Sequence, residues 1–248
     1  MTRLSVNVNK VAHLRNTRHL NIPGVLRAAR VSLDAGAGGI TVHPRPDERH
    51  IRGQDVYDLA GMLKDEYPGV ELNIEGNPFE GSYLTFVREV RPAQCTLVPD
   101  SPTAFTSDQG WQPQNDGPRL KPVIAELRSL GCRVSLFMDA DSRAISEAVG
   151  LGADAIELYT EPYAAAFETS RRLSVLEEFQ VAARVAQEAG FQINAGHDLN
   201  LENLGPLLEA IPAISEVSIG HALIAEAIFR GLGPTVQAYL RVIEDVRA

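Results

Sequence analysis

The chain has 248 residues, 44% of them hydrophobic, and a formal net charge of −9 at pH 7. This composition supports a large buried core and argues against a disordered chain, while the negative charge argues against a nucleic-acid-binding surface. Because the two cysteines, Cys95 and Cys132, lie beside predicted buried strands, we expect a reducing compartment rather than a disulfide framework.

Neither a targeting segment nor a membrane segment is predicted. Residues 1–3 lead straight into a strand pattern without the apolar region of a signal peptide. No apolar run approaches the roughly 20 residues that a membrane helix needs. We therefore expect a cytoplasmic protein that binds neither membranes nor nucleic acids.

Strand-like and helix-like patterns alternate along the whole chain. The predicted strands are 4–8, 39–43, 70–75, 94–98, 133–138, 154–158, 191–195 and 215–219. The predicted helices are 23–35, 54–67, 78–91, 118–130, 141–151, 174–189, 203–210, 221–231 and 233–247. Alternation of this kind produces parallel βαβ units, and eight of them in this length predict one (β/α)₈ TIM barrel domain over residues 1–248 with extra helices. The alternative is a doubly wound open sheet, but no glycine-rich dinucleotide loop follows the first strand.

A weak internal repeat also favours the barrel. Residues 33–42 resemble 150–158, and Gly131 and Gly190 similarly close a helix before a strand. Two connections are longer than the others. Residues 99–117 form a predicted long loop, a candidate lid, and residues 159–173 are expected to hold a short extra helix.

The segment 39–51 combines a short apolar strand with a polar loop that prolines stiffen. The strand ends at His43, and the loop then carries Arg45, Arg49 and His50. A histidine at a strand end followed by cations suits acid/base chemistry on a phosphorylated substrate. The alternative interpretation is a solvated loop beside a core histidine.

Polar residues also follow most of the other predicted strands. A barrel enzyme places its site at the carboxyl ends of its strands. Glu75 and Glu157 lie within apolar strands, where a carboxyl group needs a partner. Gly220 and His221 open a predicted helix, whose N-terminus would attract phosphate. The strand-end residues are Asn7, Asn9, Lys10, His43, Glu75, Asp139, Asp141, Glu157, Asn194, His197, Asp198, Gly220 and His221.

Other chemistries find less support in the sequence. Neither an H-x-H nor an H-E-x-x-H pair is present, so a catalytic metal is disfavoured. Of the three lysines, only Lys10 lies where a Schiff base could form. A serine nucleophile lacks its G-x-S-x-G turn. Two alternatives stay open: a metal-dependent sugar-phosphate epimerase or aldolase on the same fold, and a non-catalytic barrel that binds a phosphate ligand.

Several motifs, taken in order and spacing, resemble those of the pyridoxine 5′-phosphate synthase family over nearly the whole chain. They are Val6–Lys10 with Leu14–Arg18, Gly39–Ile51, Asn73–Glu75, Leu97–Pro99, Val134–Phe137, Asn194–His197 and Ile219–Ala222. The resemblance implies a (β/α)₈ barrel assembled as an octamer of dimers. It also implies condensation of 3-amino-2-oxopropyl phosphate with 1-deoxy-D-xylulose 5-phosphate to pyridoxine 5′-phosphate, phosphate and water, without metal or organic cofactor.

The resemblance implies residue roles as well. His43 and Glu75 match proton acceptors, His197 a proton donor and Glu157 a transition-state stabiliser. Substrate-binding positions are matched by Asn7, Arg18, Arg45, His50, Thr106, Gly220 and His221.

The chain departs from the commoner family pattern at two places. Asn9 and Lys10 replace Asp-His, and Asp198 replaces a glycine. We expect Lys10 and Asp198 to meet in one region of the barrel mouth, and we expect Asn9, Lys10 and Asp198 to contact the deoxyxylulose substrate.

Overall fold

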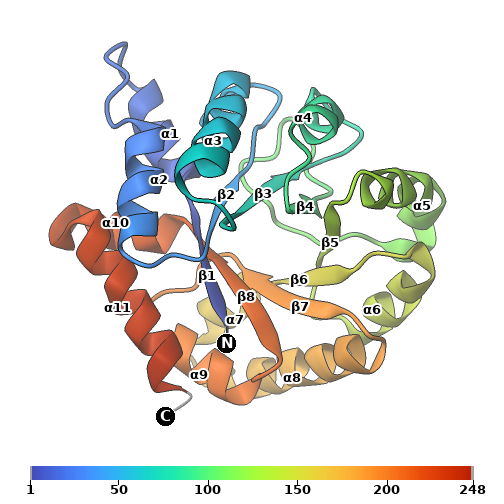
Figure 1. The fold of residues 1–248 in the computed structure, drawn as a ribbon. Helices are drawn as coiled ribbons and strands as arrows, with labels where there is room; N and C mark the ends of the chain where they lie inside the picture. The colour runs from blue at the N-terminus through green and yellow to red at the C-terminus, as the bar shows by residue number, and fades with distance from the viewer. Residues whose placement is uncertain (1, 247–248) are drawn as a thin grey trace.

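The computed structural model describes residues 2–246 and contains a closed barrel of eight parallel strands. Figure 1 shows the strands in the middle and the helices around them. The strands are β1 (Arg3–Asn7), β2 (Gly39–Val42), β3 (Glu71–Gly76), β4 (Gln94–Leu97), β5 (Arg133–Met138), β6 (Ala155–Tyr159), β7 (Gln192–Gly196) and β8 (Ile214–Ile219).

The helices follow the strands as βαβ units require. They are α1 (Asn9–Asn16), α2 (Val25–Asp34), α3 (Gly53–Glu66), α4 (Tyr83–Val90), α5 (Pro113–Ser129), α6 (Ser142–Ala148), α7 (Glu161–Ala166), α8 (Arg172–Glu188), α9 (Leu204–Ala210), α10 (His221–Arg230) and α11 (Leu232–Asp245), with a 3₁₀ turn at Val149–Leu151. The predicted (β/α)₈ barrel with extra helices is confirmed.

Closure of the sheet rests on the pairing of β1 with β8. Arg3 lies opposite Glu216 and Val6 opposite Ile219. Because every strand has two neighbours, the sheet has no edge and the open-sheet alternative is wrong. The prediction of one domain over residues 1–248 stays a prediction. Its two ends, and residue 247 of the last predicted helix, lie outside the described residues.

Two parts of the fold differ from the sequence prediction. Helix α1 lies where the sequence predicts no helix. The sequence does not reveal it because the helix is short and its apolar spacing is weak. Asn7 helps the helix to start by accepting a hydrogen bond from the Asn9 N–H at 3.0 Å. Helix α5 begins at Pro113 rather than 118, so the long loop is shorter than 99–117. Proline is tolerated in the first turn of a helix, where its missing N–H would have no intrahelical partner.

The interior of the barrel is polar at several levels. Thr96 donates to Asn73, and Asn194 donates to Gln94, which in turn donates to Glu216. Glu216 also binds Arg3 through an ion pair of 2.9 Å. Because most of these buried groups find partners inside the barrel, the polar interior does not carry the full cost of desolvation, although Nδ2 of Asn73 has no hydrogen-bond partner among residues 2–246.

Candidate active site

One cavity of about 440 Å³ opens at the carboxyl ends of the strands. Its walls come from strands β1, β3, β5, β6 and β8, from the segments that follow β1, β2, β4 and β7, and from the start of α10. The predicted site residues that line it are Asn7, Asn9, Lys10, His43, Arg45, His50, Glu75, Thr106, Glu157, His197, Asp198, Gly220 and His221. The barrel therefore brings together residues that lie up to 214 positions apart in the chain, counted from Asn7 to His221.

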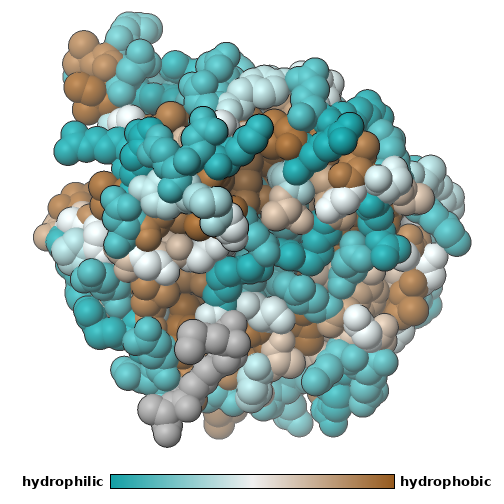
Figure 2. Space-filling view, in the orientation of Figure 1, coloured by the Kyte–Doolittle hydropathy of each residue, from teal (hydrophilic) through white to brown (hydrophobic). Residues whose placement is uncertain are grey.

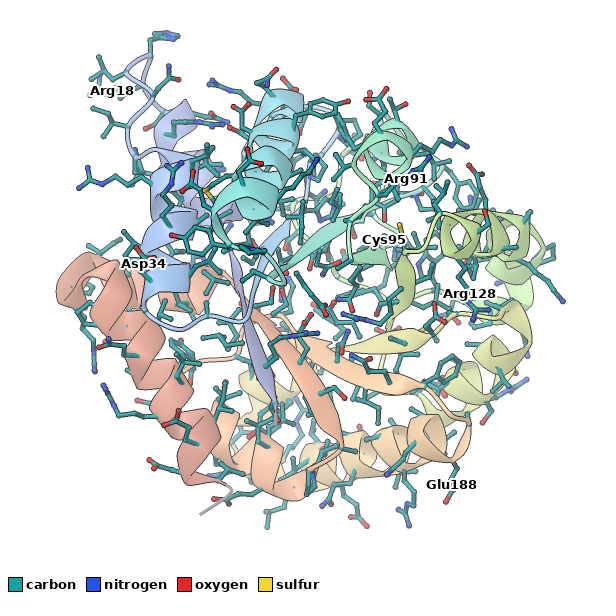
Figure 3. All side chains as sticks on the ribbon, in the orientation of Figure 1. Arg18, Asp34, Arg91, Cys95, Arg128 and Glu188 are labelled. Atoms are coloured by element: carbon teal, nitrogen blue, oxygen red, sulfur yellow. The ribbon has the colours of Figure 1, made fainter. Side chains whose placement is uncertain are left out.

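Arg18 is the predicted site residue that does not line this cavity. It follows α1 on a loop that protrudes from the barrel, and its label in Figure 3 marks the tip of that loop. The loop exposes Leu20 and Ile22, each by about two thirds or more of its surface. Within one chain Arg18 therefore does not form part of the cavity wall.

Three other strand-end residues serve the fold instead. Asp141 accepts hydrogen bonds from Arg143 and Ala144 and so caps α6. Asp139 accepts from the Gly110 N–H, and Asn194 faces the barrel interior. Position at a strand end is therefore not sufficient for a place in the site.

The cavity also contains residues that the sequence did not single out as site residues. They are His13, Val98, Phe105, Ser107, Phe137 and Ser218, whereas Arg49, a cation that the sequence did single out, also lines the cavity. His13 could have been found only by recognising α1, which places it one turn after Lys10. Ser218 lies two residues before Gly220, so strand alternation points it to the same side.

Two arginines of the β2 loop hold the long loop after β4. Arg45 donates to the Asp100 carboxylate at 2.5 Å and to the Ala104 carbonyl at 3.1 Å. Arg49 donates to the carbonyls of Ala104 and Pro102. The predicted phosphate-binding loop thus fixes the long loop over the cavity, and whether the long loop closes as a lid stays a prediction.

The two histidines of this region are neutral bases. Burial, then the neighbouring charge of Arg45, lowers the pKa of His43 well below its ordinary value. The same two causes lower the pKa of His50 to about 3. Nδ1 of His50 accepts the Ile51 N–H at 2.9 Å, so the proton of its neutral ring is on Nε2. His43 can accept a proton, and His50 can donate a hydrogen bond to an anion.

Glu75 lies at the end of β3 near His43. Its Oε2 is 3.9 Å from Nδ1 of His43 and accepts a long hydrogen bond from Asn7 at 3.4 Å. Burial raises the pKa of Glu75 well above its ordinary value, and the nearby Glu157 raises it further. These neighbours favour the protonated form of the Glu75 carboxyl.

Glu157 on β6 is fully enclosed. It accepts a hydrogen bond from Thr96 at 3.4 Å, and burial raises its pKa to about 8. Within residues 2–246, neither Glu75 nor Glu157 has an ion pair with lysine or arginine, whereas Glu216 pairs with Arg3. Since a buried carboxyl without a cation costs stability, this contrast separates functional from structural glutamates.

His197 follows β7 and lies between two polar partners. Its Nδ1 is 3.0 Å from Oδ2 of Asp198, and its Nε2 is 3.1 Å from Oγ1 of Thr106. The Tyr159 ring meets it edge to face, at 5.0 Å between centroids. The hydrogen bond from His197 lowers the pKa of Asp198, which Lys10 also lowers. Lys10 and Asp198 therefore share one region of the mouth, as predicted.

The first turn of α10 faces the cavity at Gly220 and His221. Within the described residues 2–246, no side-chain hydrogen bond caps this turn. A Cβ at position 220 would lie 3.1 Å from Cβ of Asn7, so glycine lets α10 begin close against β1. A helix N-terminus with open N–H groups is a ready anion site.

Among residues 2–246, no three His, Cys, Asp or Glu side chains are grouped so that they could hold a metal ion.

Comparison with known proteins agrees with this geometry. Residues 4–245 match the family described as pyridoxal phosphate biosynthesis protein PdxJ. The chain belongs to this family. It is 55% identical to the pyridoxine 5′-phosphate synthase of Albidiferax ferrireducens, over 100% of this chain and 99% of that one. It is 52% identical to that of Xylella fastidiosa, over 99% and 96%. The resemblance seen in the sequence is confirmed, and the protein is an enzyme of vitamin B6 biosynthesis.

Solved structures support the fold alone. The tryptophan synthase A-subunit of Pyrococcus furiosus matches with a TM-score of 0.63 at 12% identity, over 96% of this chain and 97% of that one. The Amycolatopsis orientalis BexX/CysO complex matches with a TM-score of 0.62 at 18% identity, over 100% and 91%.

Proposed function

We propose that the protein condenses 3-amino-2-oxopropyl phosphate with 1-deoxy-D-xylulose 5-phosphate, giving pyridoxine 5′-phosphate, inorganic phosphate and water. One observation carries the proposal: His43, His50, Glu75 and Glu157 line a single cavity with two anion sites, and burial there lowers the pKa of the histidines and raises that of the glutamates. Ring formation is a series of proton transfers, and groups with contrasting pKa values supply both acids and bases at neutral pH.

Two phosphate groups need two separate sites. The open N–H groups at Gly220 and His221 suit one of them. The cations Arg45 and Arg49, together with the Nε2–H of His50, suit the other. We assign the second site to the deoxyxylulose substrate. Its phosphate would compete with Asp100 and the loop carbonyls for the two guanidinium groups.

The first chemical step is addition of the amine to the ketone. His43, held neutral by burial, can take the proton that the nitrogen loses. Glu75 can act as a proton acceptor only after its pKa falls, and the cationic ammonium group of the amino substrate is the partner that would lower it. Positive charge on the intermediates would lower the pKa of Glu157 as well, so that its ionised carboxylate stabilises that charge. His197 would protonate the departing hydroxyl.

We further propose that the protein assembles with copies of itself, as the predicted octamer requires. Apolar side chains exposed around the α1 loop and on α10 support this: Leu14, Leu20, Ile22, Ile228 and Phe229. Figure 2 shows hydrophobic residues on the protruding loop at the upper left. Assembly would also give Arg18 a role, since Arg18 could contact a substrate in the cavity of another copy.

Among residues 2–246, no helix has the length and apolar character needed to cross a membrane. The cytoplasmic location stays a prediction.

The test is incubation of the purified protein with both substrates and detection of pyridoxine 5′-phosphate by mass spectrometry. We expect product and one equivalent of phosphate, unchanged after chelation of divalent metals. The His197→Asn variant is the control for catalysis by this cavity. Binding of both substrates without product would contradict the proposal. Turnover of a sugar phosphate alone that chelation abolishes would favour the epimerase or aldolase alternative.

A further inference from the structure

The bend after β7 carries two side chains where the backbone favours glycine. His197 and Asp198 have φ angles of 88° and 59°. L residues adopt this left-handed region at a cost that glycine avoids. Side chains held in a strained backbone conformation suggest a function, and the proposed function already makes His197 a proton donor. Asp198 needs its own explanation.

The bend is held by groups other than the Asp198 side chain. Thr160 donates through its hydroxyl to the His197 carbonyl at 2.6 Å. The buried Asn203 donates through Nδ2 to the Asp198 carbonyl at 3.2 Å. Replacing the Asp198 side chain therefore leaves these backbone contacts in place, and its function can be tested in a folded protein.

The carboxylate of Asp198 determines where the proton of the His197 ring is placed. Because His197 lowers the pKa of Asp198, the carboxylate is ionised and can only accept at Nδ1. The neutral ring then carries its proton on Nδ1 and presents a lone pair at Nε2. That lone pair accepts a hydrogen bond from the hydroxyl of Thr106, which lies on the long loop over the cavity.

We propose that Asp198 is a positioning residue for His197: it holds the proton on Nδ1, aims Nε2 at the reacting atoms and offsets the charge of the imidazolium. Nε2 takes up the proton that the ammonium group of the amino substrate loses before it adds, and His43 takes the proton that the nitrogen loses on addition. The ring is then an imidazolium ion. Nε2 gives this proton to the departing hydroxyl, which leaves as water, and the ring returns to the Nδ1–H form. Asp198 stays ionised throughout.

This inference rests on the donor role given to His197 in the proposed function. The rival role for Asp198 is direct contact with a substrate, as the sequence suggested. Lys10 and His221 also lower the pKa of Asp198, but the hydrogen-bonded partner is His197. The two roles differ in their dependence on His197. A positioning role for Asp198 affects the reaction only when His197 is present, whereas direct contact with a substrate would affect it without His197.

The first test is a kinetic cycle of Asp198→Asn, His197→Asn and the double variant, with Glu202→Gln as control. Glu202 lies on the same segment, is exposed, and its loss changes the net charge equally. We expect Asp198→Asn to lower kcat by about 10- to 100-fold with KM within about twofold, the scale of a lost orienting partner. The double variant should be no slower than His197→Asn, because groups that act as a unit are not additive.

The second test reads the tautomer directly. Magic-angle-spinning NMR of the ¹⁵N-histidine-labelled assembly, with His197→Asn for assignment, should show Nδ1–H at His197 in the unaltered protein and loss of that preference in Asp198→Gly. An unchanged tautomer, a double variant slower than His197→Asn, or a raised KM at unchanged kcat would each overturn the positioning role and leave the proposed function standing. Near-normal turnover of His197→Asn would overturn both.

Discussion

Replacing Glu157 by glutamine should stabilise the protein while it disables the site. Burial raises the pKa of Glu157 from 4.5 to about 8. At pH 7 the unfolded carboxyl is ionised and the folded one holds a proton. The folded state therefore carries a cost of about 3 kcal/mol at pH 7. This pH lies roughly 2.5 units above the unfolded pKa of 4.5, and each unit corresponds to about 1.36 kcal/mol. Glutamine keeps the size and polarity of the protonated acid without this cost.

The sign of the pH dependence follows from the raised pKa. The contribution of Glu157 to stability is fully present below pH 4.5 and is lost as the pH rises to about 8. Glu157→Gln should therefore melt about 6–12 °C higher at pH 7, using roughly 2–4 °C per kcal/mol for a chain of this size. The gain should be larger at pH 9 and close to zero at pH 4.

Differential scanning fluorimetry at the three pH values measures this gain, with the exposed Glu178→Gln on α8 as the matched control. In the same preparations, kcat of Glu157→Gln should fall by about 10²–10³ if Glu157 stabilises charge in the transition state. A melting temperature that does not rise at pH 7, or a gain that is the same at pH 4 and pH 9, would refute the reasoning from burial.

Three further outcomes are expected. Glu75→Gln and His197→Asn should stay folded with kcat lower by about 10²–10⁴ in product assays, the usual effect of losing a general acid or base; normal turnover would remove either residue from the mechanism. Gly220→Ala should raise KM for a phosphorylated substrate more than it lowers the melting temperature, because its methyl group would crowd Asn7 and the anion site. Unchanged KM would place the phosphate elsewhere. Mixed assemblies of Arg18→Ala and His197→Asn should regain activity that neither variant has alone, whereas inactivity of the mixture would argue against a role for Arg18 in a neighbouring cavity.

Local pattern was sufficient to predict most of the fold. Each strand is a short apolar run, and each is followed by a helical pattern, so the alternation and the count of eight could be read directly. The placement of site residues at the carboxyl ends of strands then followed from the barrel itself, since parallel strands end on one rim. For this reason the sequence alone was enough to assign His43, Glu75 and His197 to one site, and all three line the same cavity.

Sequence failed where local signals were weak or contradictory. Helix α1 is too short for a clear apolar period, so His13 was missed. Pro113 and the polar residues after it made the start of α5 look like loop, although Pro113 lies in the first turn of the helix.

The tertiary structure alone decided the electrostatics. The sequence places Glu157 near the carboxyl end of its predicted strand and Glu216 near the start of its own, but it does not show which carboxyl has a cation beside it. The barrel places Arg3 against Glu216, where its charge opposes the effect of burial on the pKa, whereas no lysine or arginine among residues 2–246 pairs with Glu157, whose pKa burial raises to about 8. The same holds for the bend after β7. Sequence marked Asp198 as an unusual residue, but only the folded chain turns its carboxylate onto Nδ1 of His197, because the direction of a side chain depends on backbone angles that distant residues hold in place.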